Sequence, residues 1–288
     1  KEALATATIF IKALFASTDD PNKLRAAFEG LGQALFASKD YEKQVGIFVQ
    51  AIFDAVKTQD QAWKLTAAFE GLGKVLFNLD VDTFNNRVGA FVKAIFDAVT
   101  NPADAWKITA AFKGLGNALF NFMISNLDTE NREKTIQIVN GFVQVIFAKG
   151  NDIQIAAAFK GLGEALFDFI YKNLDKLDKV TDVANIFIQA IFTNAVNNTQ
   201  ITAAFKGLGE ALFVLGADQM AKVMPIFVQA IFDAKTTLVR LAAAFEGLGV
   251  ALFALKPEQM AKAMPLFIQA IFDSKNVSNE KLAASFKG

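Results

Sequence analysis

The 288-residue chain contains neither cysteine nor histidine. It therefore has no means of forming disulfides, Cys/His zinc sites, cysteine nucleophiles or histidine general bases. Acidic pairs remain, but they lie in polar segments beside lysines, at Asp19–Asp20, Asp80/Asp82 and Asp175/Asp178. We expect these carboxylates to be solvated, and no serine has a plausible base. The sequence therefore predicts a protein that is not an enzyme and needs no metal or other cofactor.

The chain also has no excess of charge of either sign, with 29 basic and 29 acidic side chains. Nucleic-acid binding depends on a basic surface, so we expect no nucleic-acid partner. A long apolar run is missing too. The longest uncharged stretch, from Val183 to Phe205, contains six asparagines and glutamines. These amides are costly in lipid, so the sequence predicts no membrane span.

Tryptophan and tyrosine are scarce, with two of each, whereas there are 30 phenylalanines. The hydrophobic fraction is 53% and the mean hydropathy is +0.32. Phenylalanine offers a large apolar surface without a polar group. We therefore expect most of these rings to form a core rather than a recognition surface.

Two sequence blocks alternate along the chain. Block A reads Phe-Val-Gln-Ala-Ile-Phe-Asp from Phe48, and block B reads Ala-Ala-Phe-Glu-Gly-Leu-Gly-Gln-Ala-Leu-Phe from Ala26. Block A begins at Phe10, Phe48, Phe91, Phe142, Phe187, Phe227 and Phe267. The central phenylalanine of block B is Phe28, Phe69, Phe112, Phe159, Phe205, Phe245 or Phe286. The mean period is about 43 residues, within the range of HEAT and armadillo-type helical repeats.

Both blocks place their apolar residues at helical spacing. The sequence thus predicts an all-α solenoid of about seven repeats in one array, 1–288, without a linker. The approximate repeats are 1–39, 40–79, 80–127, 128–174, 175–215, 216–255 and a truncated 256–288. In the third and fourth repeats, about two further helical turns are expected after block B, beginning at Asn121 and Asp168.

Helix-interrupting residue types precede block A. The residue two before its first phenylalanine is Gly46, Gly89, Pro225 or Pro265 in four copies. Proline and glycine disfavour the interior of a helix. We therefore predict a break or kink there, with short amphipathic pieces such as 218–224 upstream. Each repeat would then hold two main helices and a short or kinked third, as in an armadillo-like layout.

The Gly-Leu-Gly of block B occurs six times, beginning at Gly30, Gly71, Gly114, Gly161, Gly207 and Gly247. A phosphate-binding loop would need a preceding strand, which the pattern does not predict. The Lys-Gly-Leu-Gly version resembles the calcium loop of annexins over four residues, but the Thr-Asp-Glu that follows there is replaced by Glu-Ala-Leu-Phe after Gly163. We favour a strip of small residues that lets helices cross closely, with neighbouring phenylalanine rings in the gap. Gly114→Leu should then unfold its repeat by overpacking.

Block A supplies a candidate binding surface. Its third position is mostly glutamine or lysine, and the position four residues later is often aspartate. Stacked repeats would align these side chains as two ladders along one face, which is either a solvated edge or a surface for an extended peptide or sugar chain. The predicted ladder comprises Gln50, Asp54, Lys93, Asp97, Gln144, Gln189, Gln229, Asp233, Gln269 and Asp273.

Three functions remain open on sequence alone. The near-identical repeats favour a non-catalytic structural or scaffold protein, and the last copy stops inside block B without a polar capping repeat. We therefore expect either a longer protein or self-association through the array ends. The alternatives are a peptide- or protein-binding solenoid that uses the ladder, and a lipid or hydrophobic-ligand carrier. Two glycosylation patterns, at Asn197 and Asn276, favour an extracellular setting without fixing it.

Overall fold

A computed structural model describes residues 2–128 and 130–288, and none of these residues lies in a strand. The described chain forms fourteen α-helices and three single-turn 3-10 helices, which confirms the all-α prediction. The α-helices are α1 (Glu2–Ser17), α2 (Pro21–Ala37), α3 (Tyr41–Ala55), α4 (Ala62–Asn78), α5 (Val81–Asp97), α6 (Ala105–Asn126), α7 (Arg132–Lys149), α8 (Asp152–Lys172), α9 (Leu177–Asn194), α10 (Asn198–Leu212), α11 (Ala217–Asp233), α12 (Leu238–Phe253), α13 (Pro257–Asp273) and α14 (Asn279–Lys287). The 3-10 helices are η1 (Gln59–Gln61), η2 (Pro102–Asp104) and η3 (Leu174–Lys176).

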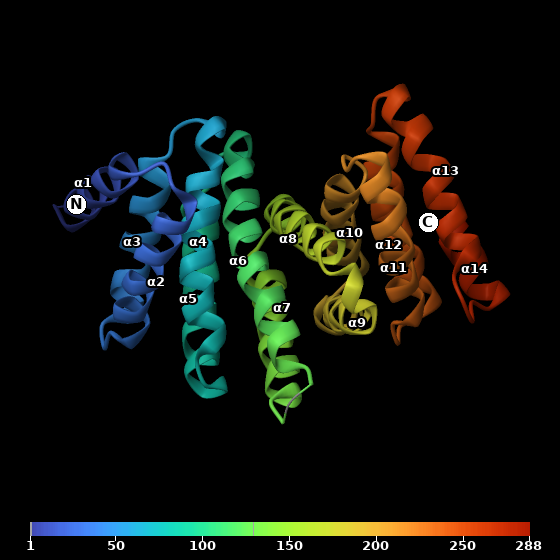
Figure 1. The fold of residues 1–288 in the computed structure, drawn as a ribbon, viewed down its shortest axis with the longest axis horizontal. Coiled ribbons are helices and arrows are strands. Elements are labelled where there is room, and N and C mark those ends of the chain that lie inside the picture. Colours follow the sequence, from blue (N-terminus) through green and yellow to red (C-terminus); the bar gives the residue numbers. More distant parts are fainter. Residues whose placement is uncertain (1, 129) are drawn as a thin grey trace.

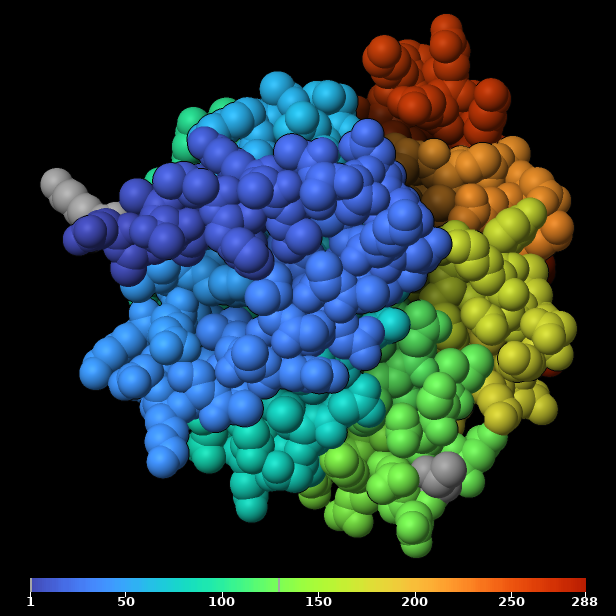
Figure 2. Space-filling model, turned by 60° about the vertical axis from the view of Figure 1, so that its left-hand side comes forward, coloured from blue at the N-terminus to red at the C-terminus, as the bar shows by residue number. Residues whose placement is uncertain are grey.

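The helices alternate between two layers. Odd-numbered helices carry block A and are called A helices here, and even-numbered helices carry block B and are called B helices. Each B helix packs on the next B helix, and each A helix packs on the next A helix. The pairs follow one another along the long axis of the molecule (Figure 1), and in Figure 2 successive pairs wind around it. The predicted solenoid is therefore present, with a superhelical twist.

Helix starts follow from local capping chemistry. Asp20 accepts a hydrogen bond from the backbone N–H of Asn22, just before Pro21 opens α2. Asn151 and Gln154 form a reciprocal capping box at the start of α8. Such caps satisfy N–H groups that lack a partner within the helix. They fix where α2 and α8 begin, and therefore which side chains of these helices face their neighbours.

The predicted break before block A does not form. Helix α11 continues through Pro225, α13 through Pro265, and α3 through Gly46. A proline removes only one backbone donor, and the A helix buries apolar side chains on both sides of that point. Each repeat therefore contains two helices, and the only additional elements in the described chain are the three 3-10 turns.

The core is a continuous series of phenylalanine contacts. Phe112 of α6 stacks on Phe96 of α5, with ring centroids 5.6 Å apart, and lies 6.0 Å from Phe142 of α7. Phe142 also meets Phe77 of α4 edge-on at 5.2 Å. All four rings are buried, as predicted from their lack of polar groups. Because equivalent contacts recur in successive repeats, the core runs along the array.

The glycines of block B set the distance between B helices. A β carbon on Gly114 would lie 2.2 Å from the backbone oxygen of Thr66 in the preceding B helix. A β carbon on Gly116, the second glycine, would lie 2.7 Å from that of Ala165 in the following B helix. The predicted close crossing is therefore present. The prediction that phenylalanine rings fill the gap between these helices is wrong, because backbone, alanine and leucine atoms occupy it.

Two B helices in the middle of the array are longer than the others. Helices α6 and α8 have 22 and 21 residues, whereas α2, α4, α10 and α12 have 17, 17, 15 and 16. Phe122 and Phe169 in the added turns are buried. The extensions predicted after Asn121 and Asp168 are confirmed.

Candidate binding groove

The predicted Gln/Asp ladder lies on the A helices, and its members mostly bond within their own helix. Gln50, Gln229 and Gln269 donate to Asp54, Asp233 and Asp273 at 3.0, 2.8 and 2.7 Å. Lys93 forms an ion pair with Asp97 in the same way. The structure therefore brings these four ladder residues together with the aspartate four positions later, whereas Ala148 and Thr193 stand at that position after Gln144 and Gln189.

Two ladder glutamines also link neighbouring repeats. The amide of Gln229 donates to the backbone oxygen of Lys275 at 3.2 Å and accepts from the Lys275 N–H at 2.7 Å. Gln189 makes the same pair of bonds with Lys235, at 3.4 and 2.8 Å. These amides already hold the A–B loop of the next repeat. Gln144 is exposed and makes no such bond among the described residues.

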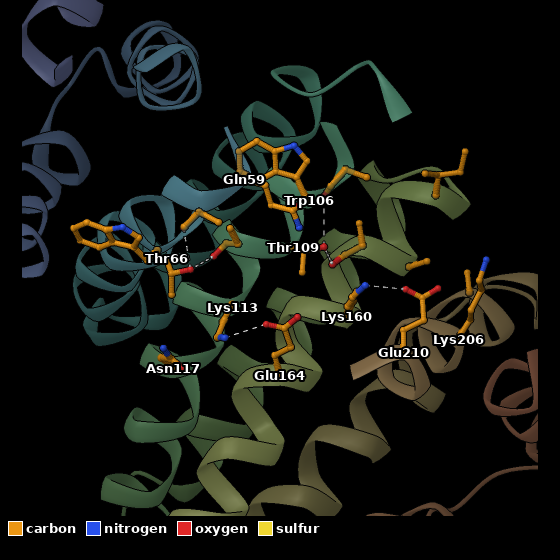
Figure 3. A pocket seen from close by; sticks show the side chains of 18 of the residues that line it. Gln59, Thr66, Trp106, Thr109, Lys113, Asn117, Lys160, Glu164, Lys206 and Glu210 are labelled. Atoms are coloured by element: carbon orange, nitrogen blue, oxygen red, sulfur yellow. Dashed lines mark hydrogen bonds and ion pairs between the residues drawn. The ribbon is translucent and has the colours of Figure 1, made fainter. Parts of the chain in front are cut away.

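A large hollow lies on the B helices instead. It has a volume of about 960 Å³ and is lined by residues of α2, α4, α6, α8, α10 and α12, together with Gln59 of η1. One stripe of each of α4, α6, α8 and α10 faces it (Figure 3). We call this feature the B-helix groove. Its volume lies at the upper end of the range for ligand sites, roughly 300–1,000 Å³.

The floor of the groove consists of threonines and alanines. Thr66, Thr109 and Thr202 each donate from the side-chain hydroxyl to a backbone oxygen of the next B helix, at 3.2 Å in all three cases. These threonines lie three residues before the central phenylalanine. The hydroxyl protons are therefore used within the array, and the helical backbone of the floor is already hydrogen-bonded.

One side of the groove carries a ladder of ion pairs between repeats. Lys113 meets Glu164 at 3.0 Å, and Lys160 meets Glu210 at 3.3 Å. In each pair the lysine directly follows the central phenylalanine of its own B helix. The glutamate lies five positions after the central phenylalanine of the next B helix. Such partly exposed pairs each contribute little to stability, about 0–1 kcal/mol, but they fix the position of their charges.

Lys206 is the exception in this ladder. Its counterpart in the next B helix is Val250, which is 46% exposed, where Glu164 and Glu210 stand in earlier repeats. Within residues 2–128 and 130–288, no carboxylate lies within ion-pair distance of Lys206. A cation without a counterion therefore lines the groove (Figure 3).

The other side of the groove carries large apolar side chains. Trp63 and Trp106, the only tryptophans of the chain, occupy equivalent positions at the start of α4 and α6, six residues before the central phenylalanine. Both indoles are partly exposed. Ile153 of α8 holds the same position and is 56% exposed. Neither indole N–H finds an acceptor in the described part of the molecule.

The sequence contained signals for this groove that the ladder prediction did not use. Both tryptophans stand six residues before a block-B phenylalanine, and the Lys/Glu exchange follows the same register. Charged residues on a helix usually mark a solvated face, so periodicity alone did not distinguish the groove from bulk surface.

Other chemistry has little support in the geometry. Among the described residues, no group of three or more acidic side chains is placed to hold a metal ion. The same residues contain no helix with the length and apolar composition needed to cross a bilayer. The absence of an enzyme activity and of a cofactor stays a prediction.

Comparison with known proteins adds no family assignment. No family model matches the chain, and no curated protein matches it in sequence. The architecture and the B-helix groove are therefore the features from which a function has to be inferred.

Proposed function

We propose that this protein is a non-catalytic scaffold that binds an extended segment of another protein along the B-helix groove. The observation that carries the proposal is the groove itself, which repeats one register of apolar, small and charged positions over successive B helices. Superhelical repeat arrays use such continuous surfaces to bind extended partners. The balanced charges of the groove favour a peptide over a nucleic acid.

The mixture of charged and apolar lining also favours a peptide over a lipid. Lys113, Lys160 and Lys206 line the groove together with Glu164 and Glu210. A lipid tail would remove water from these charges without replacing their hydration. The carrier hypothesis therefore ranks below peptide binding, and native mass spectrometry for bound apolar mass would test it.

A blocking substitution tests peptide binding. Ala156 lines the groove near the start of α8 and is partly exposed. Ala156→Arg should fill the groove and reduce the capture of peptides selected from a displayed random library by at least ten-fold. The matched control is Gln144→Arg, which places the same side chain on the A-helix face. Equal capture by both variants and the wild type would refute the groove as the binding site.

The Gln/Asp ladder remains a separate proposal for the same function. If it binds the partner, Gln144→Glu and Gln189→Glu should remove capture while leaving helicity unchanged. Gln189 also holds Lys235 of the next repeat. Gln144→Glu is therefore the cleaner test, because this side chain makes no such bond.

Self-association is a second candidate function, and the phenylalanine core supplies a specific observation for it. The first phenylalanine of an A helix lies between two B-helix rings, as Phe267 does between Phe213 at 5.4 Å and Phe245 at 6.1 Å. The next such pair is Phe253 and Phe286, which are 70% and 53% exposed. Phe10 of α1 is 53% exposed and lacks a pair of this kind.

We therefore propose that Phe10 of one copy can occupy the position between Phe253 and Phe286 of another. Sedimentation over a concentration series tests this. Phe10→Ser should lower the association constant at least ten-fold, and Phe253→Ser should do the same. A wild-type protein that stays monomeric at high concentration would refute it. Phe10→Ser mixed with Phe253→Ser should form only heterodimers, since each retains one intact face.

A further inference from the structure

The spacing of the B helices limits which backbone conformations of a bound peptide can present the same face to successive B helices. From α4 to α12 their backbones touch at the first glycine of block B, as at Gly161, where a β carbon would lie 2.2 Å from the Thr109 oxygen. Packed helices have axes roughly 8–10 Å apart, and contacts through glycine belong at the short end of that range. Equivalent groove positions therefore recur about every 8–9 Å.

Among regular backbone conformations, polyproline II matches this period best. It has three residues per turn and a rise of about 3.1 Å per residue, so one face recurs about every 9 Å. An extended β-strand presents the same face about every 6.6–6.8 Å, and an α-helix makes one turn in about 5.4 Å. A polyproline II segment could thus place one residue of each triplet at each B helix.

The hydrogen-bonding groups of the groove fit the same conformation. The indole N–H groups of Trp63 and Trp106 are donors without an acceptor among the described residues. A polyproline II backbone has no internal hydrogen bonds, so its carbonyl oxygens are free to accept from such donors. A β-strand would also need partners for its N–H groups, and helical walls offer no strand edge. Prolines carry no N–H that requires a partner.

Charge adds a further requirement on the ligand. Lys206 of α10 lies two B helices beyond Trp106 of α6 and has no counterion among the described residues. Two B-helix spacings correspond to about six residues of polyproline II. An acidic side chain about six residues from the proline at Trp106 would therefore meet Lys206.

We infer that the B-helix groove binds a proline-rich segment in the polyproline II conformation, with prolines on Trp63 and Trp106 and an acidic residue at Lys206. This inference rests on the proposed peptide-binding function and specifies the ligand class. The two tryptophans give the groove its selectivity for proline rings and carbonyl oxygens, and Lys206 sets the position of the ligand along the array.

Intrinsic fluorescence provides a direct readout, because both tryptophans of the chain line the groove. The probes are twelve-residue peptides of Pro-Pro-Ala triplets in which glutamate replaces the first proline of the last triplet or the second proline of the first triplet, one peptide for each orientation. The controls are a Gly-Ser peptide of equal length and charge and the Pro-Pro-Ala peptide without glutamate. We expect a saturable change in emission with one proline-glutamate peptide, at an affinity at least ten-fold above that for the Gly-Ser peptide.

Variants then assign the contacts. Trp63→Phe and Trp106→Phe keep an aromatic ring but remove the donor, and each should weaken binding several-fold. Lys206→Gln should reduce the affinity for the proline-glutamate peptide several-fold and leave the affinity for the uncharged proline peptide unchanged. Circular dichroism of each variant checks that the fold is retained.

The outcomes separate this inference from the function on which it rests. Equal affinity for the proline-rich and Gly-Ser peptides, both abolished by Ala156→Arg, would overturn the polyproline II inference and leave peptide binding in the groove intact. No emission change with the proline-rich probes would also overturn the inference, whatever library peptides bind. Library capture that is indifferent to Ala156→Arg would overturn the proposed function as well.

Discussion

The α carbon of Gly161 faces the backbone oxygen of Thr109 so closely that a β carbon there would lie 2.2 Å from that oxygen and 2.7 Å from the backbone nitrogen of Lys113. Such separations leave room only for hydrogen. The same relationship recurs at Gly71, Gly114, Gly207 and Gly247, so a main-chain contact determines the spacing of the B helices.

Gly161→Ala should therefore destabilise the array even though alanine is the better helix former. Displacing a packed backbone typically costs about 1–3 kcal/mol, which exceeds the gain of roughly 1 kcal/mol in helix propensity. The matched control is Gly30→Ala, because a β carbon on Gly30 meets nothing within 4 Å. Thermal unfolding should show a lower midpoint for the first variant and an unchanged or higher midpoint for the second. If both variants behaved alike, the close crossing would be refuted.

Gly114→Leu should be more severe, since a whole side chain would meet the Thr66 carbonyl. Units in a repeat array contact mainly their neighbours, so the damage should remain local. Hydrogen exchange should show loss of protection in α4 and α6 first. Uniform loss across all helices would contradict this expectation.

Gln229→Ala should loosen the loop that contains Lys275. The variant removes the two amide–backbone bonds, each with a net contribution of about 0.5–1.5 kcal/mol. Exchange of the Lys275 amide should become faster, and the unfolding midpoint should fall. Gln144→Ala serves as the control, because Gln144 makes no bond of this kind, and it should change neither quantity.

Acidification should weaken the start of α5. Hydrogen bonds from the Thr83 backbone N–H, and then from its side chain, hold the pKa of Asp80 below its ordinary value. A carboxyl group with a lowered pKa in the folded state stabilises the fold above its unfolded pKa, and the contribution disappears as pH falls through the folded pKa. Asp80→Asn keeps a capping oxygen that does not titrate. Its unfolding midpoint should fall less than that of the wild type between neutral and acidic pH.

Tyr41 should remain protonated at alkaline pH as long as the protein is folded. Burial raises the pKa of its phenol well above the ordinary value, the Arg87 charge opposes this shift, and the hydroxyl donates to the Arg87 backbone oxygen at 2.8 Å. A raised folded pKa means that stability is complete below the unfolded pKa and is lost as pH rises through the folded one. In a Tyr171→Phe background Tyr41 is the sole tyrosine, so phenolate absorbance should appear only together with unfolding. Absorbance that rises while helicity is unchanged would contradict the burial argument.

The sequence predicted most of the fold, but the ladder that it predicted as a binding surface shares no residue with the B-helix groove. Helical periodicity and the phenylalanine spacing predicted the paired helices. The additional residues that begin at Asn121 and Asp168 predicted the longer α6 and α8. The helix break predicted at Pro225 and Pro265 was wrong, because both prolines lie in helices that bury apolar side chains on either side of the proline. That outcome depends on tertiary packing, which local propensity does not contain.

The groove could not be predicted for a related reason. Which stripe of a helix lines a hollow depends on the superhelical twist, and no single repeat encodes that twist. Lys113 and Glu164 read as solvated charges within their own repeats, and only the neighbouring repeat makes them partners. That Lys206 lacks a carboxylate partner can be recognised only once the structure places Val250 opposite it.

The direction of the ion pairs between B helices has a consequence for the order of the repeats. From α2 to α4 the earlier helix supplies the acid, Glu29, and the later one the base, Lys74; from α6 onward the order is reversed, with Lys113 facing Glu164. At the change of direction the neutral Asn117 meets Glu70. Duplicating the α7–α8 unit in place would add another matched pair, whereas a first-half unit inserted there would oppose like charges. Repeats can thus be added among those that share one order of acid and base. Exchanging repeats between the two orders would bring like charges together.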